Sequence, residues 1–269
     1  MSSSPIATMA FPYKHFLLIG ATSGIGQAMA DRLIEAGAKV TAVGRREDRL
    51  EDFVSRHGQS RAKAVPFDIS NKEQIPQFAA DVMRTSPDID CIFLNAGIQR
   101  PPCDFSHPEH VDLAQFNLEI DVNFSSSVAI THAFLPFLIS KQSQTSLIFT
   151  GSNLAIVPGA RLPGYSASKA ALNAFVLCLR EQLRNTNVQV IEVSPPPVQT
   201  ELHDYMGEET GRNLGMPLSV FTEEAYRGLA AGHDQIVIGS IGPAETFHEI
   251  IDKRRSAFTA LAMIMRGGS

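Results

Sequence analysis

The sequence predicts an α/β fold, a single-domain, doubly wound parallel sheet with helices on both faces. Short, continuous apolar runs alternate along the chain with stretches of helical periodicity. Such runs, joined by helices, are typical of parallel strands that are covered on both sides. The first apolar run also ends in a glycine-rich turn that leads directly into a helical pattern, as in Rossmann-type sheets.

The predicted elements follow one another in a regular order. We expect strands at residues 15–19, 39–43, 62–67, 90–94, 146–150, 188–193 and 235–238. We expect helices at residues 25–36, 47–57, 72–84, about 109–138 and about 164–184. Residues 199–221 lack this periodicity and predict an irregular, mobile flap, because long loops in compact domains tend to be functional. Residues 1–12 predict a flexible lead, and no linker divides residues 13–269.

Composition and charge exclude several classes of protein. Of the 269 residues, 44% are hydrophobic and 19% are charged, which is enough to bury a large core. The net charge is −5 and Lys and Arg form no long run, so we expect no nucleic-acid partner. The most apolar C-terminal stretch, residues 257–265, is shorter than the ~20 residues of a membrane span. We expect it to pack on the body of the protein or on a partner subunit.

The cysteines and histidines predict neither disulfides nor a metal site. Cys91, Cys103 and Cys178 are an odd number, widely spaced and without a Cys-x-x-Cys pair. The histidines form no His-Glu-x-x-His pattern. The N-terminus lacks the charged start and apolar run of a secretory signal. We therefore expect a protein of a reducing compartment, the cytoplasm, that needs no metal.

Three glycines mark the turn after the first predicted strand. Gly20, Gly24 and Gly26 lie in IGATSGIG, where the predicted helix opens. Glycines let a pyrophosphate approach the backbone there, and the N–H groups and dipole of the helix start favour its negative charge. The spacing is G-x-x-x-G-x-G rather than G-x-G-x-x-G. This pattern favours a dinucleotide site, and the alternative is a turn that only closes the strand–helix corner.

The end of the second predicted strand favours NADP(H) over NAD(H). Many NAD-binding sheets have an acidic residue for the ribose hydroxyls ~20 residues after the glycine turn. Here the strand ends in VGRR, with Gly44 in the expected place of the acid. Arg45 and Arg46 offer guanidinium groups suited to a 2′-phosphate. Arg45 lies nearer to the strand end and is the stronger candidate, although either arginine could simply be solvated at the start of the next helix.

Tyr165 and Lys169 form the candidate catalytic pair. They are four residues apart in a predicted helix, so both project from one face with their Cβ atoms about 5–6 Å apart. A neighbouring ammonium would lower the pKa of the phenol and suit it to proton exchange. Ser152, in the turn after a strand, could hydrogen-bond a substrate carbonyl oxygen. The alternative interpretation of such a pair is an ordinary surface contact between a tyrosine and a lysine.

Taken together, these features resemble the compact, single-domain branch of the short-chain dehydrogenase/reductase family, over roughly residues 14–239. The family pattern is met in order by the glycine turn, Asp68, Asn95-Ala96-Gly97, Asn123, Ser152 and Tyr165/Lys169. The resemblance implies that Asp68 contacts the adenine and that Asn95 braces the sheet. It also implies that Asn123 holds a water that relays protons to Lys169. By themselves, Asp68 could be a cap, Asn95 a turn residue and Asn123 a polar residue that bends its helix.

The resemblance extends the candidate site to a defined set of residues. The expected catalytic residues are Asn123, Ser152, Tyr165 and Lys169. The expected cofactor-binding residues are Gly20, Thr22, Ser23, Gly24, Ile25, Gly26, Arg45, Arg46, Asp68, Asn95, Ala96, Gly97, Tyr165, Lys169, Pro195, Val198 and Thr200. The chain departs from the family pattern at Ile19, Leu94 and Pro196, where Thr, Asn and Gly are usual. The Pro195-Pro196 pair stiffens the loop whose Val198 and Thr200 would contact the nicotinamide carboxamide.

The expected substrate is an uncharged, fairly hydrophobic carbonyl compound or secondary alcohol. Residues 99–105, 154–163 and the flap would bound its pocket, and apolar side chains dominate in them. Two alternatives stay open: a relative that acts on an imine or C=C bond or guides a cyclisation, and a regulator that binds cofactor without turnover. Resemblance to the family also implies a homodimer or homotetramer, formed through residues 109–138 and 164–184.

Overall fold

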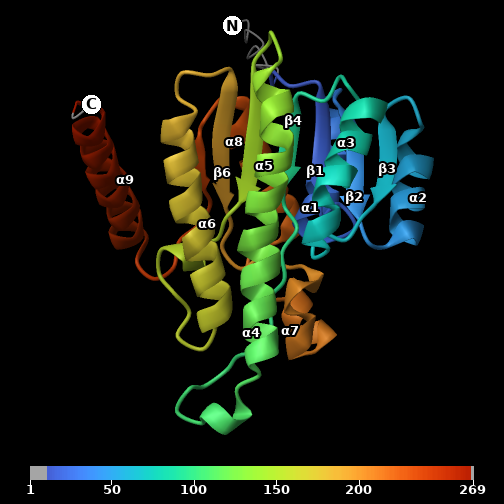
Figure 1. Ribbon diagram of the computed structural model, residues 1–269. Coiled ribbons are helices and arrows are strands. Elements are labelled where there is room, and N and C mark those ends of the chain that lie inside the picture. Colours follow the sequence, from blue (N-terminus) through green and yellow to red (C-terminus); the bar gives the residue numbers. More distant parts are fainter. Residues whose placement is uncertain (1–10, 268–269) are drawn as a thin grey trace, which may run out of the picture.

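The computed structural model describes residues 11–267 and contains a seven-stranded parallel sheet with the order β3-β2-β1-β4-β5-β6-β7 (Figure 1). The strands are β1 (His15–Ile19), β2 (Lys39–Gly44), β3 (Ala62–Pro66), β4 (Cys91–Leu94), β5 (Thr145–Thr150), β6 (Val188–Ser194) and β7 (Gln235–Val237). The strand order reverses between β1 and β4. Ligands of doubly wound sheets bind at such a point, beyond the carboxyl ends of the strands. The predicted fold class is confirmed.

Helices cover both faces of the sheet (Figure 1). Along the chain they are α1 (Gly24–Glu35), α2 (Glu47–His57), α3 (Ile75–Thr85), α4 (Leu113–Ile120), α5 (Ser126–Ile139), α6 (Pro163–Gln182), α7 (Glu208–Arg212), α8 (Leu218–Ala230) and α9 (Ala244–Gly267). One core joins α1, α2 and α8 to the sheet, and a second joins α3, α5 and α6 to its other face.

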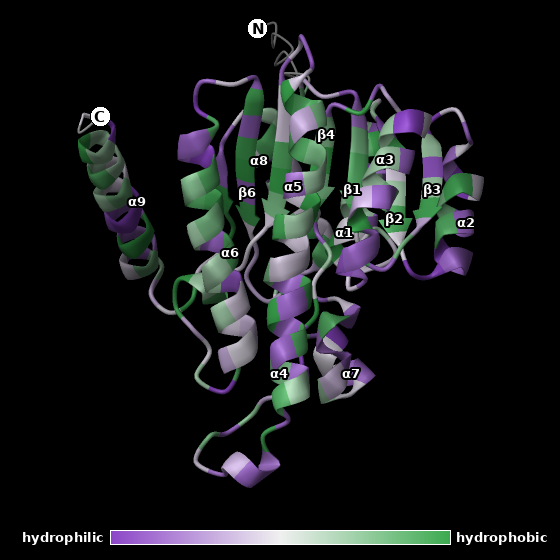
Figure 2. Ribbon diagram, in the orientation of Figure 1, coloured by the Kyte–Doolittle hydropathy of each residue, from purple (hydrophilic) through white to green (hydrophobic). Residues whose placement is uncertain are grey.

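The central strands are buried along their whole length because both faces are covered. In β1, Phe16 and Leu18 pack into the first core, whereas Leu17 and Ile19 pack into the second. Successive strand side chains point to opposite faces, so both sets must be apolar. Figure 2 shows the resulting continuous hydrophobic strands between the helices. This arrangement is the physical reason why the strands appear as unbroken apolar runs in the sequence.

The predicted helix at residues 109–138 is divided into parts. A 3-10 turn, η2 (Pro108–His110), precedes α4, and the Asp112 side chain caps α4 by accepting hydrogen bonds from the next turn. A π-helical turn, η3 (Asp121–Ser125), then joins α4 to α5. By length and composition alone the segment Leu113–Ile139 would also pass as a membrane span. Phe134 and Leu138 of this segment are fully buried in the second core, as in a core helix of a globular protein.

The flap and the C-terminal segment differ from the predictions. Within residues 199–221, which we expected to be irregular, the chain forms the 3-10 helix η5 (Glu201–Met206), helix α7 and the start of α8. The 24-residue helix α9 was not predicted. Within 257–265 only Ala262 is buried, so most of this stretch does not pack on the body as one of our two alternatives expected. The predicted lead at residues 1–12 falls almost wholly outside the described residues.

Candidate active site

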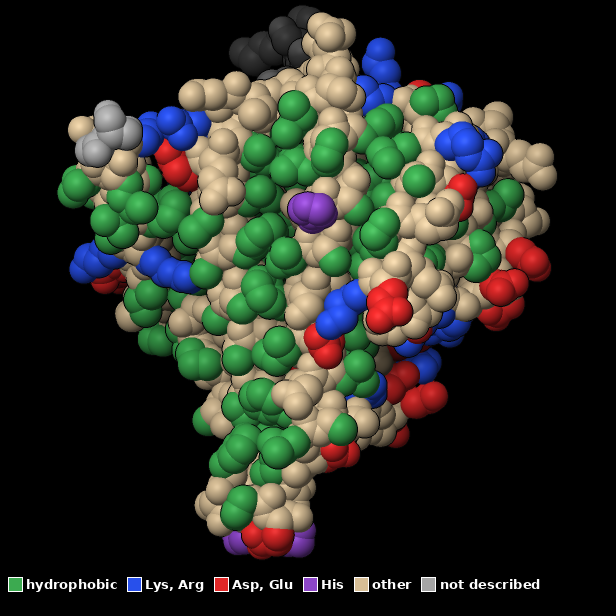
Figure 3. Space-filling view, in the orientation of Figure 1, with side chains coloured by type: hydrophobic (Ala, Val, Ile, Leu, Met, Phe, Trp, Pro, Cys, Tyr) green, Lys and Arg blue, Asp and Glu red, His purple; other side chains and the backbone are tan. Residues whose placement is uncertain are grey.

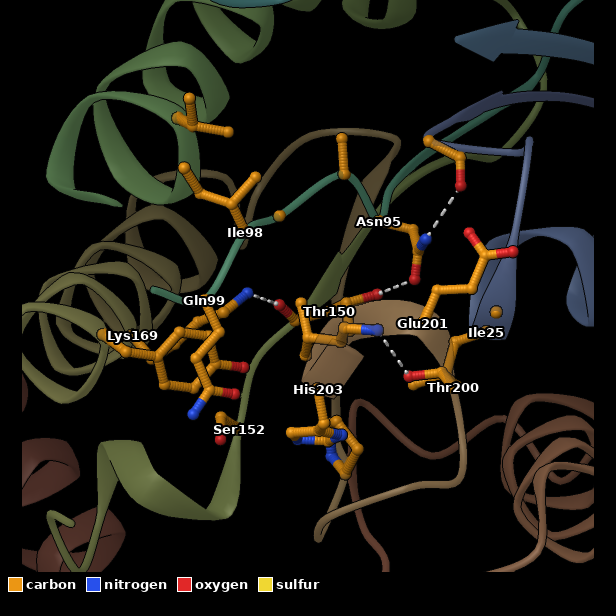
Figure 4. A pocket seen from close by; sticks show the side chains of 18 of the residues that line it. Ile25, Asn95, Ile98, Gln99, Thr150, Ser152, Lys169, Thr200, Glu201 and His203 are labelled. Atoms are coloured by element: carbon orange, nitrogen blue, oxygen red, sulfur yellow. Dashed lines mark hydrogen bonds between the residues drawn. The ribbon is translucent and has the colours of Figure 1, made fainter. Parts of the chain in front are cut away.

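A cleft of about 880 Å³ lies beyond the carboxyl ends of β1, β2, β4 and β5. The glycine turn lies at one end, and the turn after β5 and the start of α6 lie at the other. The flap segment lines the cleft through residues such as Thr200, Glu201 and His203. Figure 4 shows these three residues facing Asn95, Ser152 and Lys169. The residues predicted from distant parts of the sequence therefore meet at the reversal of the strand order.

Close backbone packing explains the glycines of the turn. Gly20 has φ +88°, and a Cβ there would lie 2.6 Å from the Ala96 backbone. A Cβ on Gly26 would collide with the Gly20 carbonyl and lie 2.5 Å from Asn95 Nδ2. The glycines thus allow β1, α1 and the segment after β4 to approach one another, and they leave the backbone at the start of α1 accessible from the cleft. This is the geometry that a pyrophosphate site needs.

Asn95 joins three parts of the site. Its Nδ2 donates to the Gly20 carbonyl at 3.1 Å, and its Oδ1 accepts a hydrogen bond from Thr150 Oγ1 at 3.0 Å. The side chain therefore ties the end of β4 to the glycine turn after β1 and to the end of β5 (Figure 4). A half-buried side-chain amide whose donor and acceptor are both satisfied in this way rigidifies the segments that it joins.

The two candidate arginines have different surroundings. The Arg45 side chain is 68% exposed, and its Nη1 lies 3.8 Å from a carboxylate oxygen of Asp68. Arg46 instead donates to Thr22 Oγ1, to Ser23 Oγ and, at 2.7 Å, to Glu201 Oε2. Arg45 thus keeps most of its donors open to a ligand, whereas the protein already occupies those of Arg46.

Tyr165, Lys169 and Ser152 converge from two elements. Tyr165 and Lys169 lie on α6 and are 6% and 3% exposed, so their pairing is not the ordinary surface contact that the spacing alone allowed. Lys169 Nζ donates to the Thr150 carbonyl at 2.9 Å and lies 5.8 Å from the centre of the Tyr165 ring. Ser152 caps the 3-10 turn η4 (Asn153–Ala155) through its Oγ and hydrogen-bonds Tyr165.

The pKa of Tyr165 differs from the expectation. Burial raises the pKa to about 12, with a smaller contribution from the charge of Glu119, and the hydrogen bond with Ser152 only partly offsets this. The expected lowering by Lys169 is not observed. Burial also lowers the pKa of Lys169 to about 8, against the attraction of Glu192. The loss of hydration on burial therefore shifts both pKa values more than the placement of Tyr165 and Lys169 on one helix face does.

Asn123 lies on the π-helical turn, behind the cleft wall. Its Oδ1 accepts a hydrogen bond from the Ile98 N–H at 2.8 Å, and its Nδ2 donates to the Ile98 carbonyl at 2.9 Å and to Ser168 Oγ at 3.0 Å. A Cβ on Gly97 would lie 3.2 Å from Asn123 Oδ1 and 3.5 Å from Lys169 Nζ. Asn123 thus fixes the segment after β4 beside Lys169, and π turns occur frequently at functional sites.

The end of the cleft beside Ser152 and Tyr165 is more polar than the sequence suggested, because buried polar groups face its apolar walls. Gln99 and His203 are 8% and 6% exposed, and Gln99 Nε2 donates to the Tyr205 hydroxyl at 3.1 Å. His203 Nδ1 and Arg100 Nε are buried without a hydrogen-bond partner among the described residues. Leucines and prolines such as Leu154 line the same end. Within residues 11–267, no three His, Cys, Asp or Glu side chains are placed to bind a metal ion.

Comparisons with known proteins identify the family. The family model described as short chain dehydrogenase matches residues 14–211. The chain belongs to the short-chain dehydrogenase family. A Bacillus subtilis relative named uncharacterized oxidoreductase DltE is 33% identical over 221 residues, which cover 82% of this chain and 86% of the relative. Sulfoacetaldehyde reductase 2 of Chromohalobacter salexigens is 32% identical over 186 residues, covering 69% of this chain and 73% of the relative.

Solved structures of this family share the fold. A serine dehydrogenase in its closed form, complexed with NADP+, superposes with a TM-score of 0.76 at 25% identity. The match covers 85% of this chain and 97% of the serine dehydrogenase. The chain is therefore an oxidoreductase of the short-chain dehydrogenase family, with structural neighbours that bind nicotinamide dinucleotides.

The structure brings nearly all of the expected family residues to the cleft. The lining includes Gly20, Thr22, Ser23, Gly24, Ile25, Arg45, Arg46, Asp68, Asn95, Ala96, Gly97, Ser152, Tyr165, Lys169, Pro195, Val198 and Thr200. Gly26 and Asn123 lie behind this wall. Asp68 also accepts a hydrogen bond from the Ser70 N–H at 3.0 Å, so it caps a turn as well as facing the cleft.

Three features of the site escaped the sequence analysis. Glu201 accepts hydrogen bonds from Arg46 and Arg49 and so links the flap to the start of α2. Glu119 is buried beside the start of α6. His203 and Tyr205 project from η5. For Glu201, His203 and Tyr205 the available signal was their position in the predicted flap. Glu119 gave no such signal, because no local sequence pattern pairs residues so far apart in the chain.

Proposed function

We propose that this chain is an NADP(H)-dependent oxidoreductase that transfers a hydride between the nicotinamide and a carbonyl or secondary alcohol carbon. The observation that carries the proposal is the convergence of Ser152, Tyr165 and Lys169 on a cleft whose other end is the glycine turn. A catalytic hydroxyl, a phenol and an amine beside a dinucleotide-shaped groove suit acid–base chemistry at a carbon that exchanges a hydride.

The residues present fit the cofactor. The glycine turn would hold the pyrophosphate, since Gly20 and Gly26 have no room for a side chain and leave backbone N–H groups accessible. Arg45 would bind the 2′-phosphate, and Asp68 would contact the adenine. Val198 and Thr200 would bind the nicotinamide carboxamide. When bound, the reduced cofactor supplies the hydride, and every proton movement falls to the protein.

In the direction of reduction, Tyr165 acts as the proton donor. Its raised pKa keeps the phenol protonated at neutral pH. Ser152 Oγ would hydrogen-bond the substrate oxygen and stabilise its developing negative charge. The Tyr165 O–H bond then breaks, and its proton moves to that oxygen. Lys169, together with the water that Asn123 is expected to hold, would then return a proton to the phenolate, and Asn123 holds the neighbouring backbone in place.

The substrate that we propose is an uncharged, fairly hydrophobic carbonyl compound, bound between the flap and the segments 99–105 and 154–163. Leu154, Leu162 and Met206 provide apolar walls there. A second candidate is a carbonyl compound with an acidic group. Arg100 and Arg161 line the same end, and the relative from Chromohalobacter salexigens is named a sulfoacetaldehyde reductase.

We also propose that the chain is a cytoplasmic homodimer or homotetramer, assembled through residues 109–138 and 164–184. The three cysteines form no disulfide, which suits a reducing compartment. Apolar side chains spread over the outer faces of α5 and α6 (Figure 3), and Ile139 is 43% exposed. Such a face favours a subunit contact. Light scattering should give a dimer or tetramer mass, and Ala174→Glu on the exposed face of α6 should reduce it.

The decisive experiment compares wild type with Tyr165→Phe on a panel of ketones, aldehydes, imines and enones, following NADPH fluorescence. We expect kcat for carbonyl reduction to fall at least about a hundredfold while NADPH binding is kept. Tyr226→Phe, which removes a hydroxyl on α8 away from the cleft, is the matched control. Equal rates in wild type and Tyr165→Phe would exclude Tyr165 as the acid. Turnover of imines or enones alone would favour an enzyme that acts on C=N or C=C bonds. NADPH binding without turnover of any compound would favour a regulator.

A further inference from the structure

Glu119 is a buried acid next to the catalytic helix. It lies on the last turn of α4 and is 5% exposed, whereas most of that helix faces solvent or is half-buried. Among residues 11–267 it takes part in no ion pair. Burying a carboxylate without a paired cation is costly unless hydrogen bonds compensate for the lost water. The contacts of Glu119 must therefore compensate for the burial of its charge.

The contacts of Glu119 join two segments that build the site. Its Oε1 accepts a hydrogen bond from the Arg100 N–H at 2.7 Å, in the segment that follows the Asn95-Ala96-Gly97 turn. The backbone N–H of Tyr165 interacts with the same carboxylate. Gly164 packs so closely that a Cβ there would collide with Glu119 Oε2. The acid therefore lies between the segment after β4 and the first turn of α6.

This position also satisfies the start of α6. The N-cap residue of α6, Leu162, provides no side-chain hydrogen bond to the helix. The first N–H groups of a helix need partners, and the dipole favours a negative charge at that end. Glu119 supplies that charge from a different helix. It does not line the cleft itself, so any effect on chemistry must pass through the groups that it holds.

The charge of Glu119 acts on the phenols of the site. It raises the pKa of Tyr165, after the larger effect of burial, and it raises the pKa of Tyr205 in the same way. Burial also raises the pKa of Glu119, although the Arg100 N–H, the Arg100 charge and the Tyr165 N–H oppose this. The other titratable or charged groups that face this region are Arg100, Arg161, Lys169, Glu192, His203 and Tyr205.

We propose that Glu119 is a positioning residue for the Tyr165 acid. Its carboxylate fixes the first turn of α6 against the segment after β4, and its negative charge opposes formation of the phenolate, so that the phenol keeps its proton until substrate is in place. The inference rests on the proposed function, because it assigns to Glu119 a role in the chemistry of Tyr165.

The test is the pH dependence of kcat for carbonyl reduction in Glu119→Gln. We expect the alkaline pKa of the profile, where Tyr165 loses its proton, to move down by about one pH unit because the opposing charge is gone. We also expect kcat to fall about tenfold, since the amide cannot accept from both N–H groups, while KM for NADPH stays unchanged. Asp112→Asn, which weakens the exposed N-cap of α4, is the matched control and should leave the alkaline pKa of the profile unchanged.

A second variant and a second readout keep the result decisive. Glu119→Met has a similar volume without a buried polar group, so it serves if the glutamine variant does not fold. Fluorinated tyrosine, incorporated throughout and titrated by 19F NMR without cofactor, reports Tyr165 directly, and its signal is assigned by its loss in Tyr165→Phe. A lower Tyr165 pKa in the uncharged variants supports the inference even if no substrate is turned over, which separates it from the proposed function. An unchanged Tyr165 pKa overturns it.

Discussion

Backbone contacts build the glycine-turn end of the cleft, whereas buried ionisable side chains build the catalytic end. At the first, Gly20 and Gly26 bring β1, α1 and the segment after β4 together because they lack side chains. At the second, Tyr165 and Lys169 lie beside the buried acids Glu119 and Glu192. The first end therefore depends on shape and tolerates changes of pH, while the second depends on charge balance in a low-dielectric setting.

Among the changes at the glycine-turn end, we expect Gly26→Ala to have the largest effect on cofactor binding. The added Cβ would collide with the Gly20 carbonyl and Asn95 Nδ2, so the turn must shift. We expect the Kd for NADPH to rise about ten- to a hundredfold, from the 1–3 kcal/mol typical of overpacking. Fluorescence titration measures it. Gly267→Ala, at the end of α9 with nothing within 4 Å of the new Cβ and no positive φ, is the control and should leave the Kd unchanged. Similar affinities in both variants would refute the steric explanation.

Arg45→Ala tests the charged component of the glycine-turn end. Charge-assisted hydrogen bonds are worth about 1.5–3 kcal/mol, so we expect the Kd for NADPH to rise about tenfold or more, with little change for NADH. Arg46→Ala is the comparison, because the donors of Arg46 already bind Thr22, Ser23 and Glu201. If Arg46→Ala instead produces the larger loss of NADPH selectivity, the two arginines exchange roles.

The same contrast explains what the sequence could predict. Strands and the glycine turn depend on neighbouring residues, so β1 and its pattern of Gly20 and Gly26 could be placed correctly. The Tyr165/Lys169 spacing is equally local. The pKa of Tyr165 could not be predicted, since it depends on burial, which α6 acquires only by packing on the sheet. Nor could α9 be predicted: its charged residues lie mostly in its first half, its second half is largely apolar, and several of those apolar side chains, such as Ile264, remain exposed.

A pH-dependent stability of the catalytic end would support its dependence on charge. Burial lowers the pKa of Lys169 to about 8 from 10.5, so between these values the unfolded state binds the proton that the native state has lost. Stability from this residue therefore rises as the pH increases from about 8 to 10.5, by up to about 3 kcal/mol. Lys169→Met should abolish that rise relative to wild type in denaturant unfolding. Lys253→Met on the surface is the control, and a wild-type slope retained in Lys169→Met would contradict the assignment.

The smallest effect that we expect concerns Glu201, which connects the two ends. Its carboxylate accepts hydrogen bonds from Arg46 at 2.7 Å and Arg49 at 2.8 Å, and it follows Thr200, which packs against Gly24. Burial raises the pKa of Glu201, but these arginines lower it overall and keep it ionised. Glu201 and both arginines are partly exposed, so each ion pair contributes less than about 1 kcal/mol to stability. Glu201→Gln should therefore change the Kd for NADPH only a few-fold.

The direction of that change distinguishes two roles for Glu201. If it mainly neutralises Arg46, the glutamine variant binds NADPH more tightly while NADH binding stays the same. If it mainly holds the flap, both cofactors bind more weakly, and hydrogen exchange in residues 199–212 becomes faster. Glu208→Gln, an exposed acid of α7, controls for the loss of one negative charge from the flap. The difference in Kd between wild type and Glu201→Gln should also shrink as ionic strength rises, because salt screens the ion pairs of Glu201.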